Sequence, residues 1–190
     1  MPLHHEPQFT REYLDEYEAE SLSELGQAII ANRWNLVQRY TPNGGLLFDL
    51  GCGSGHFLMA APDGYICKCY DPNPHGKYLN WVWDFNPEIL TMWDVIEHLD
   101  VPYAPFNYWV PKPKWVFIST PNIDNAELDS VTSWKHVKPG EHKYYFCLKS
   151  LIAMMYCNGY EVVDSNWREG LLRDPSNPLA IVTVVGRRMA

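Results

Sequence analysis

Three closely spaced glycines and a later carboxylate indicate a site for a nucleoside-type ligand. Gly51, Gly53 and Gly55 follow a short apolar run and alternate with single residues. Glycines at such a corner allow the backbone to turn tightly and to approach a ligand closely. Asp71 lies about twenty residues further on, where a carboxylate can accept hydrogen bonds from the hydroxyls of a ribose. The pattern therefore predicts that the loop and Asp71 bind one ligand together.

The spacing of the glycines distinguishes between cofactors. The dinucleotide-binding fingerprint has glycines at its first, third and sixth places, whereas here Gly55 takes the fifth place and His56 the sixth. Asp49, just before the loop, would put a negative charge where an amine-bearing ligand binds better than a pyrophosphate. The glycine spacing therefore argues against a nicotinamide-dependent enzyme, which stays a third and weaker hypothesis for this chain.

Three histidines are the candidate proton acceptors. His98 follows a predicted strand at the edge of the sheet where open α/β folds bind ligands. His136 and His142 lie in a long polar segment, residues 123–143, which we interpret as a lid or binding loop, with a mobile surface loop as the alternative. Histidine can take a proton near neutral pH, so His98 is expected to line the site and His136 or His142 to act as a base. The alternative for each is a purely structural role. No metal site is predicted, because such a site needs three or four convergent ligands.

Alternating strands and helices must position these residues. Short apolar runs predict strands at residues 46–50, 65–70, 88–93, 115–119, 160–164 and 181–186, and a weaker candidate lies at 79–83. Helices are predicted at residues 21–40, 56–61 and 144–157. The first would begin at Ser21, which has capping-box spacing to Glu24, and it carries Arg33 on its apolar stripe, where a charged group needs a partner. The alternation predicts an α/β fold with a mostly parallel sheet covered on both faces.

Composition and charge restrict the class of protein. The 190 residues fit one domain, which we divide into a helical segment at 1–42 and an α/β core at 43–190. Fifteen basic and 23 acidic residues give a net charge of -8, which argues against nucleic acid as a partner. The sequence contains no run of 18 apolar residues, so no membrane span is predicted. The N-terminal residues do not resemble a signal peptide. Five cysteines without a CxxC pair favour a reducing, cytoplasmic setting.

The glycine segment resembles a known family. Phe48-Asp49-Leu50-Gly51-Cys52-Gly53-Ser54-Gly55 resembles the first motif of class I S-adenosylmethionine-dependent methyltransferases. The segment from Thr91 to Leu99 resembles the segment after the fourth strand in small-molecule methyltransferases close to the ubiquinone-biosynthesis type. Residues 119–122 and 134–142 resemble later segments of the same group. The resemblance covers roughly residues 20 to 187. It implies a Rossmann-like three-layer sandwich with a seven-stranded sheet in the order 3-2-1-4-5-7-6, in which the last strand is antiparallel.

The resemblance also implies S-adenosylmethionine as the cofactor and a set of residues that bind it. These residues are Asp49, Gly51, Cys52, Gly53, Gly55, Phe57, Tyr70, Asp71, Pro72, Asp84, Phe85, Trp93 and Asp94. The glycine loop would pack against the methionine part, with Asp49 near the amino group, and Asp71 would bind the ribose. Asp84 and Phe85 would meet the adenine edge, and Asp84 has a surface turn as its alternative role.

One departure from the family affects the functional hypothesis. Only twelve residues separate Asp71 from Asp84, so the helix after the second strand is expected to be reduced or absent. The leading hypothesis is a methyltransferase acting on a small molecule by in-line displacement. The alternative is a non-catalytic module with the same fold that binds the cofactor or a partner, and the shortened region is its main support.

Overall fold

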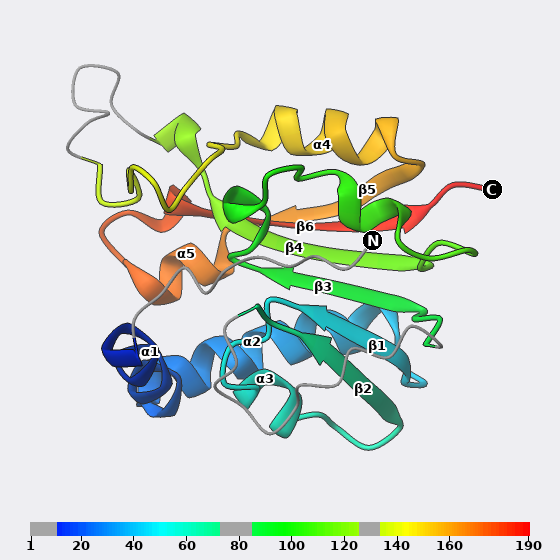
Figure 1. Ribbon diagram of the computed structural model, residues 1–190, viewed down its shortest axis with the longest axis horizontal. Coiled ribbons are helices and arrows are strands. Elements are labelled where there is room, and N and C mark those ends of the chain that lie inside the picture. Colours follow the sequence, from blue (N-terminus) through cyan, green and yellow to red (C-terminus); the bar gives the residue numbers. More distant parts are fainter. Residues whose placement is uncertain (1–10, 73–84, 126–133) are drawn as a thin grey trace.

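The computed structural model describes residues 11–72, 85–125 and 134–190 (Figure 1). Its helices are α1 (Arg11–Leu22), α2 (Glu24–Tyr40), α3 (His56–Met59), α4 (Leu148–Cys157) and α5 (Arg168–Arg173). Its strands are β1 (Gly45–Leu50), β2 (Tyr65–Tyr70), β3 (Ile89–Trp93), β4 (Trp115–Pro121), β5 (Tyr160–Asn166) and β6 (Ile181–Arg188). Short 3-10 helices are η1 (Ile96–His98), η2 (Ala104–Asn107), η3 (Ile123–Asn125) and η5 (Pro178–Ala180).

The described strands form one mixed sheet in the order β2-β1-β3-β4-β6-β5. Neighbours from β2 to β4 are parallel, and β6 is antiparallel to both β4 and β5. The predicted α/β class and the antiparallel last strand are confirmed. The weak strand candidate at residues 79–83 and the segment expected to lack a helix lie outside the described residues, so six of the seven expected strands are seen.

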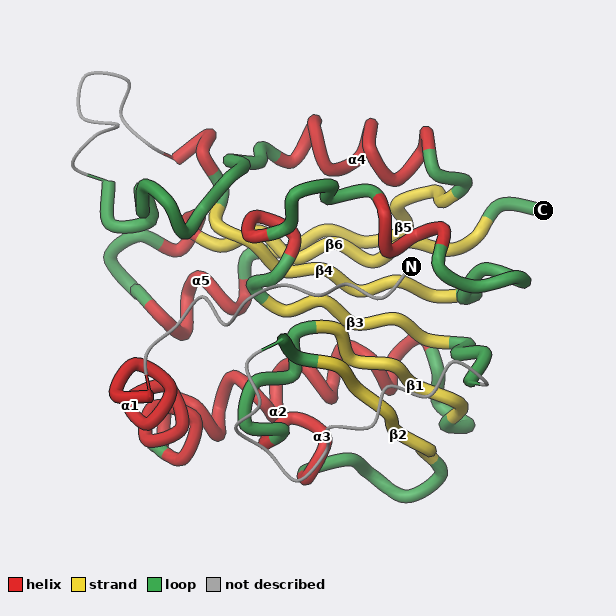
Figure 2. The backbone as a smooth tube through the Cα atoms, viewed as in Figure 1, coloured by secondary structure: helices red, strands yellow, loops and turns green. Residues whose placement is uncertain are grey.

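Helices and loops cover the sheet on both faces. One core contains Ile30, Trp34 and Val37 of α2 against Leu47 and Phe117 of the sheet. The other core packs α4 and the segment around η2 against the opposite face of the same strands. In Figure 2 the strands run through the middle of the molecule, with α4 on one side and α2 and α3 on the other. The central strands β3 and β4 are buried along almost their whole length, as expected for strands covered on both faces. The outer strands β2 and β5 are only partly buried and carry charged residues.

Two helix starts differ from the sequence prediction. α2 begins after Ser23, whose Oγ accepts a hydrogen bond from the Gly26 amide at 3.0 Å. Ser21 instead belongs to α1, a separate helix that carries five acidic residues. α4 begins after Cys147 and not at Tyr144, because the chain before it runs beside β4 through a bridge between Asn122 and Phe146.

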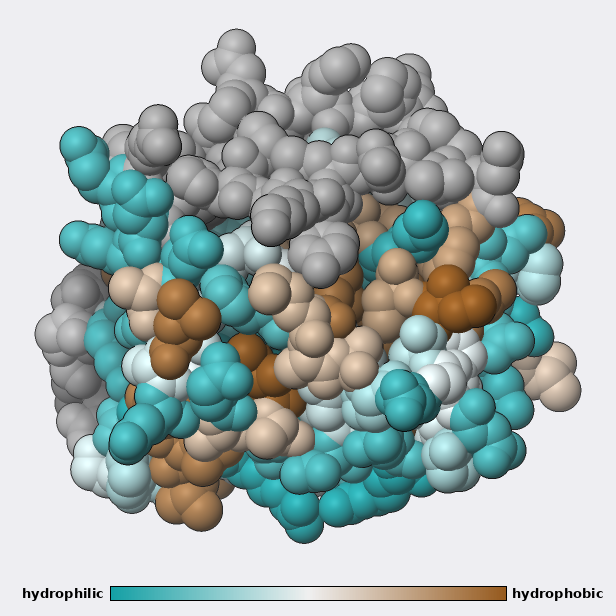
Figure 3. Space-filling model, turned by 90° about the horizontal axis from the view of Figure 1, so that it is seen from below, coloured by the Kyte–Doolittle hydropathy of each residue, from teal (hydrophilic) through white to brown (hydrophobic). Residues whose placement is uncertain are grey.

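Two further features are the distribution of hydrophobic residues on the surface and the character of the helices. Seen from below the view of Figure 1, hydrophobic residues lie in small groups separated by hydrophilic ones (Figure 3). Among the described residues, no helix combines the length and the apolar character needed to cross a membrane.

Candidate active site

A cavity of about 430 Å³ opens where the parallel strands end. Its wall includes the glycine loop after β1, the end of β2, the segment after β3 and residues 135–142. Tyr17 of α1 and Arg173 of α5 also line it, and Figure 1 shows both helices at this end of the sheet. Open α/β sheets bind ligands at this edge, so the cavity is the candidate active site.

The glycine loop turns at the mouth of β1 and leaves room for a ligand. Gly51 and Gly53 have φ of 77° and 52°, a region that favours glycine. A Cβ on Gly51 would lie 2.3 Å from Val95 Cγ2, whereas a Cβ on Gly53 would meet nothing within 4 Å. Gly51 is therefore required for packing, and Gly53 keeps space open on the cavity side.

Asp71 holds the glycine loop, and Asp49 lies buried near the end of β1. The Gly53 amide donates to Asp71 Oδ2 at 2.8 Å, which ties the loop to the end of β2. Asp49 is only 2 % exposed, and Thr91 Oγ1 donates to its Oδ1 at 2.6 Å. Burial raises the pKa of Asp49 to about 7, although the Thr91 hydrogen bond and the charge of Arg33 oppose the shift. A cationic ligand group beside Asp49 would therefore be stabilised by its carboxylate.

Most of the predicted cofactor set lies around this cavity. The members that line it are Asp49, Gly51, Cys52, Gly53, Phe57, Tyr70, Asp71, Pro72, Trp93 and Asp94. Gly55 is not in the lining and precedes the first residue of α3. Phe85 packs in the core, with its ring centroid 6.4 Å from that of Phe48, and not at the cavity. Asp84 lies outside the described residues.

Asp94 belongs to a buried network of four charges. Arg33 Nη2 contacts Asp94 Oδ2 at 3.0 Å and Glu169 Oε1 at 2.6 Å, and Arg173 bonds both carboxylates from the other side. Burial opposes ionisation of Asp94, but the charges of Arg173 and Arg33 lower its pKa overall. The partner predicted for Arg33 is confirmed. The network joins α2, α5 and the end of β3, so it fixes one wall of the cavity.

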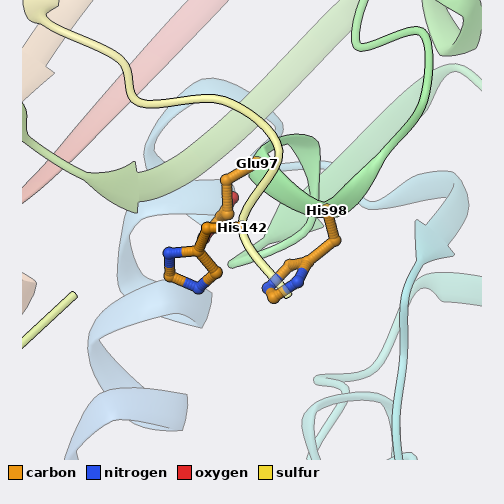
Figure 4. A group of neighbouring side chains, drawn as sticks. All are labelled: Glu97, His98 and His142. Atoms are coloured by element: carbon orange, nitrogen blue, oxygen red, sulfur yellow. The ribbon is translucent and has the colours of Figure 1, made fainter. Parts of the chain in front are cut away.

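Two predicted histidines and one carboxylate meet at the other wall. The rings of His98 and His142 lie 4.7 Å apart, edge to face. Glu97, 1 % exposed, lies beside them, and Thr120 Oγ1 donates to its Oε2 at 2.9 Å. One ligand atom from each of Glu97, His98 and His142 lies within 4.8 Å of the others (Figure 4). Burial raises the pKa of Glu97 to about 8 and lowers the pKa values of His98 and His142.

His136 completes the predicted group of histidines at the cavity. Its ring centroid is 5.0 Å from that of Trp134, and its Nε2 is buried without a hydrogen-bond partner among the described residues. Burial lowers the pKa of His136 to about 4. All three histidines line one cavity although they come from two segments.

Sequence reasoning did not identify three charged residues of the site. Glu97 stands between Ile96 and His98 after β3 and carries no sequence signal of its own. Glu169 and Arg173 lie four residues apart in α5, a spacing that places them on one helix face. That spacing is a signal for the ion pair, but it does not predict contact with Arg33.

Comparison with known proteins gives a family match and several similar folds. A family model described as "Methyltransferase domain" matches residues 22–165. Among solved structures, a SAM-dependent methyltransferase from Archaeoglobus fulgidus is 16% identical, with 93% of this chain and 100% of that chain covered and a TM-score of 0.60. Magnesium protoporphyrin IX methyltransferase (ChlM) from Synechocystis PCC 6803 with bound SAH is 14% identical, with 85% and 82% covered and a TM-score of 0.56.

A third similar structure has a protein partner. It is a putative methyltransferase in a complex with the Haloferax volcanii Trm112 methyltransferase activator, 12% identical, with 92% of this chain and 98% of that chain covered and a TM-score of 0.62. At these identities the similarity concerns the fold. The curated proteins contain no match.

Proposed function

The chain belongs to the methyltransferase domain family, and from this premise we propose that it transfers the methyl group of S-adenosylmethionine to a small-molecule acceptor. The family resemblance read from the glycine segment is thereby confirmed, and the nicotinamide hypothesis is set aside. The observation that carries the proposal is the joint placement of Asp49, the open glycine loop and Asp71 on one cavity.

The residues at the cavity fit this cofactor. The space beside Gly53, which a Cβ would enter, can take a ligand chain close to the backbone. The buried carboxyl of Asp49 suits the ammonium of an amino acid part, and Asp71 suits ribose hydroxyls. Tyr70 and Pro72 offer apolar surface for a flat base. When bound, the cofactor supplies an electrophilic methyl group on a sulfonium.

The protein's own contribution is binding, orientation and the handling of a proton. Asp49 and Asp71 fix two ends of the ligand, and the loop between them sets its depth in the cavity. We assign His98 to the acceptor wall and His136 or His142 to accepting the proton of a hydroxyl acceptor. All three rings line the same cavity as the glycine loop, and they come from the segments after β3 and β4.

The size and charge of the site favour a small acceptor. A volume of about 430 Å³ lies in the range of small-molecule pockets, and the net charge of -8 disfavours a phosphate backbone. The non-catalytic alternative was based on the region after Asp71, which lies outside the described residues apart from Pro72. No described feature of the cavity favours that alternative.

A methyl-transfer assay tests the proposed function. The protein would be incubated with methyl-tritiated S-adenosylmethionine and three classes of acceptor: hydroxylated small molecules, RNA oligonucleotides and peptides. We expect label in the small-molecule fraction. At subsaturating S-adenosylmethionine that transfer should be reduced by Asp71→Ala and retained by Asp63→Ala, a matched change at an exposed turn. Label confined to RNA or peptide would contradict the acceptor class, and no transfer to any class would contradict the activity.

A further inference from the structure

Glu97, His98 and His142 form a group that the methyl-donor site does not use. If His142 binds an ion, His136 is the histidine left to accept a proton in the proposed function. We infer that these three side chains bind one divalent transition-metal ion at the acceptor wall of the cavity. Figure 4 shows them side by side, with Glu97 and His98 from η1 and His142 from the loop before α4. Their candidate ligand atoms lie within 4.8 Å of one another. Ligands of one ion lie about 2.0–2.2 Å from it, so small side-chain rotations bring all three into bonding range.

The backbone holds the two segments together at this point. The amides of Lys143 and Tyr144 both donate to the Glu97 carbonyl, at 2.7 and 3.2 Å. The loop is thus anchored one residue after His142, directly on the residue that supplies the carboxylate. The convergence of the three side chains is therefore built into the fold and does not depend on long, mobile side chains.

Two buried atoms of the group have no partner among the described residues. These are Glu97 Oε1 and His142 Nδ1. Buried polar atoms are nearly always paired, and a metal ion would satisfy both at once. The remaining atoms are oriented from outside the group. Thr120 donates to the other oxygen of Glu97, and His98 Nδ1 lies 3.1 Å from the Glu141 carbonyl. Such outer contacts are typical of metal-binding side chains.

Glu97 differs from Asp94 and Glu169, the carboxylates of the four-charge network, in its lack of a basic ion-pair partner among the residues that the structure describes. Asp94 and Glu169 each contact both Arg33 and Arg173. Within the described residues, Glu97 has no Lys or Arg in an ion pair, and its close neighbours are two imidazoles. A buried carboxylate without a compensating cation is costly. A divalent ion would supply the missing positive charge.

The ligand types indicate which ions the site prefers. Imidazole nitrogens favour first-row transition metals, whereas Mg²⁺ prefers oxygen ligands alone. Two histidines and one carboxylate therefore suit Mn²⁺, Co²⁺, Fe²⁺ or Zn²⁺ better than Mg²⁺. Three protein ligands also leave coordination positions open. If the proposed function holds, on which this last step rests, those positions select an acceptor that presents oxygen atoms next to the methyl donor.

Manganese binding to the metal-free protein tests this inference. Chelator-treated protein would be titrated with Mn²⁺, and free Mn²⁺ would be followed by electron paramagnetic resonance. Mn²⁺ is a suitable probe because it binds poorly to the five free cysteines. We expect one site per chain, weaker binding of Mg²⁺ in competition, and a loss of affinity of more than about 10-fold in Glu97→Gln, His98→Asn and His142→Asn.

The matched control is His56→Asn, which changes a histidine at the opposite, glycine-loop side of the same cavity. Its Mn²⁺ affinity should equal that of the wild type. Absence of stoichiometric Mn²⁺ binding in the wild type, or equal affinity in the control and in all cluster variants that fold, would overturn the inference. S-adenosylhomocysteine would be titrated separately without metal. If the wild type binds Mn²⁺ but not S-adenosylhomocysteine, the proposed function is contradicted. If it binds S-adenosylhomocysteine but not Mn²⁺, the cation site is contradicted.

Discussion

Asp49, which we propose binds the amino group of the cofactor, is buried at a cost to the fold. Its pKa is raised by burial from 3.8 to about 7. The folded protein therefore binds a proton that the unfolded chain has released above pH 4. The contribution of this proton to the free energy of unfolding is fully present below the unfolded pKa of 3.8, and it is lost as the pH rises to about 7. An ammonium group at the cavity would offset the cost by favouring the ionised form.

Asp49→Asn should remove the cost of burying an ionised carboxyl at this position. The amide cannot ionise, so the variant should be more stable than the wild type at pH 8, by up to about 4 kcal/mol, with a smaller difference at pH 4.5. Urea unfolding at both pH values measures this. Asp63→Asn, at an exposed turn, is the control and should follow the wild type. An Asp49→Asn protein with the wild-type pH dependence would refute the assigned titration.

Asp71 should be required for ligand affinity more than for the fold. Its carboxylate accepts from the Gly53 amide, and we propose that it also binds ribose. Asp71→Ala should weaken binding of S-adenosylhomocysteine by one to a few kcal/mol, roughly the contribution of hydrogen bonds to a charged group. Calorimetry measures the difference. Equal dissociation constants in wild type and variant would refute the ribose role.

At the scale of elements, the four-charge network couples α2 and α5 to the end of β3. Removing one member leaves buried carboxylates with a single arginine. Arg33→Met should therefore destabilise the protein by about 3–5 kcal/mol. Arg39→Met, on the same helix, changes an arginine that is 48% exposed in a surface pair with Asp164, and should cost less than about 1 kcal/mol. Thermal and urea unfolding would compare the two variants. Similar losses in the free energy of unfolding would show that the network does not stabilise the fold.

The loop before α4 should serve the acceptor and not the cofactor. It carries His136 and His142 on the cavity wall. Replacing residues 131–142 with a short Gly/Ser linker should abolish methyl transfer but leave S-adenosylhomocysteine binding within about twofold of the wild type, because no predicted cofactor residue lies there. Transfer at the wild-type rate would contradict this placement of the acceptor.

Elements whose signals are local were predictable, and those set by tertiary contacts were not. β1 and β2 could be predicted because each is a short apolar run bounded by turn residues. The start of α2 was displaced because Ser21 and Ser23 both precede helix-forming residues, and only the structure shows which one caps. Tyr144 precedes α4 without joining it because its amide bonds to the Glu97 carbonyl. That contact links distant segments and leaves no periodic signal in the sequence.

At the scale of the whole molecule, the sheet explains why the site could be predicted in part. Parallel strands bring their carboxyl ends to one edge, so residues after β1, β2 and β3 meet without further information. This accounts for the joint placement of Asp49, Asp71 and His98 on one cavity. Arg173 and His142 reach the same cavity from α5 and from the loop before α4. Their positions depend on how those segments pack, which periodicity does not encode.

The central claim is that the cavity at this edge binds the methyl donor of the reaction. Calorimetric titration of S-adenosylhomocysteine into the wild type and Gly53→Val, with NAD as the control ligand, tests it most directly. The wild type should bind S-adenosylhomocysteine at one site per chain and should not bind NAD. Gly53→Val should fold with reduced stability, because a φ of 52° strains a β-branched residue. It should lose this binding, because the valine side chain would enter the open space beside the loop. Undiminished affinity in folded Gly53→Val, or a wild type that binds NAD and not S-adenosylhomocysteine, would contradict the account.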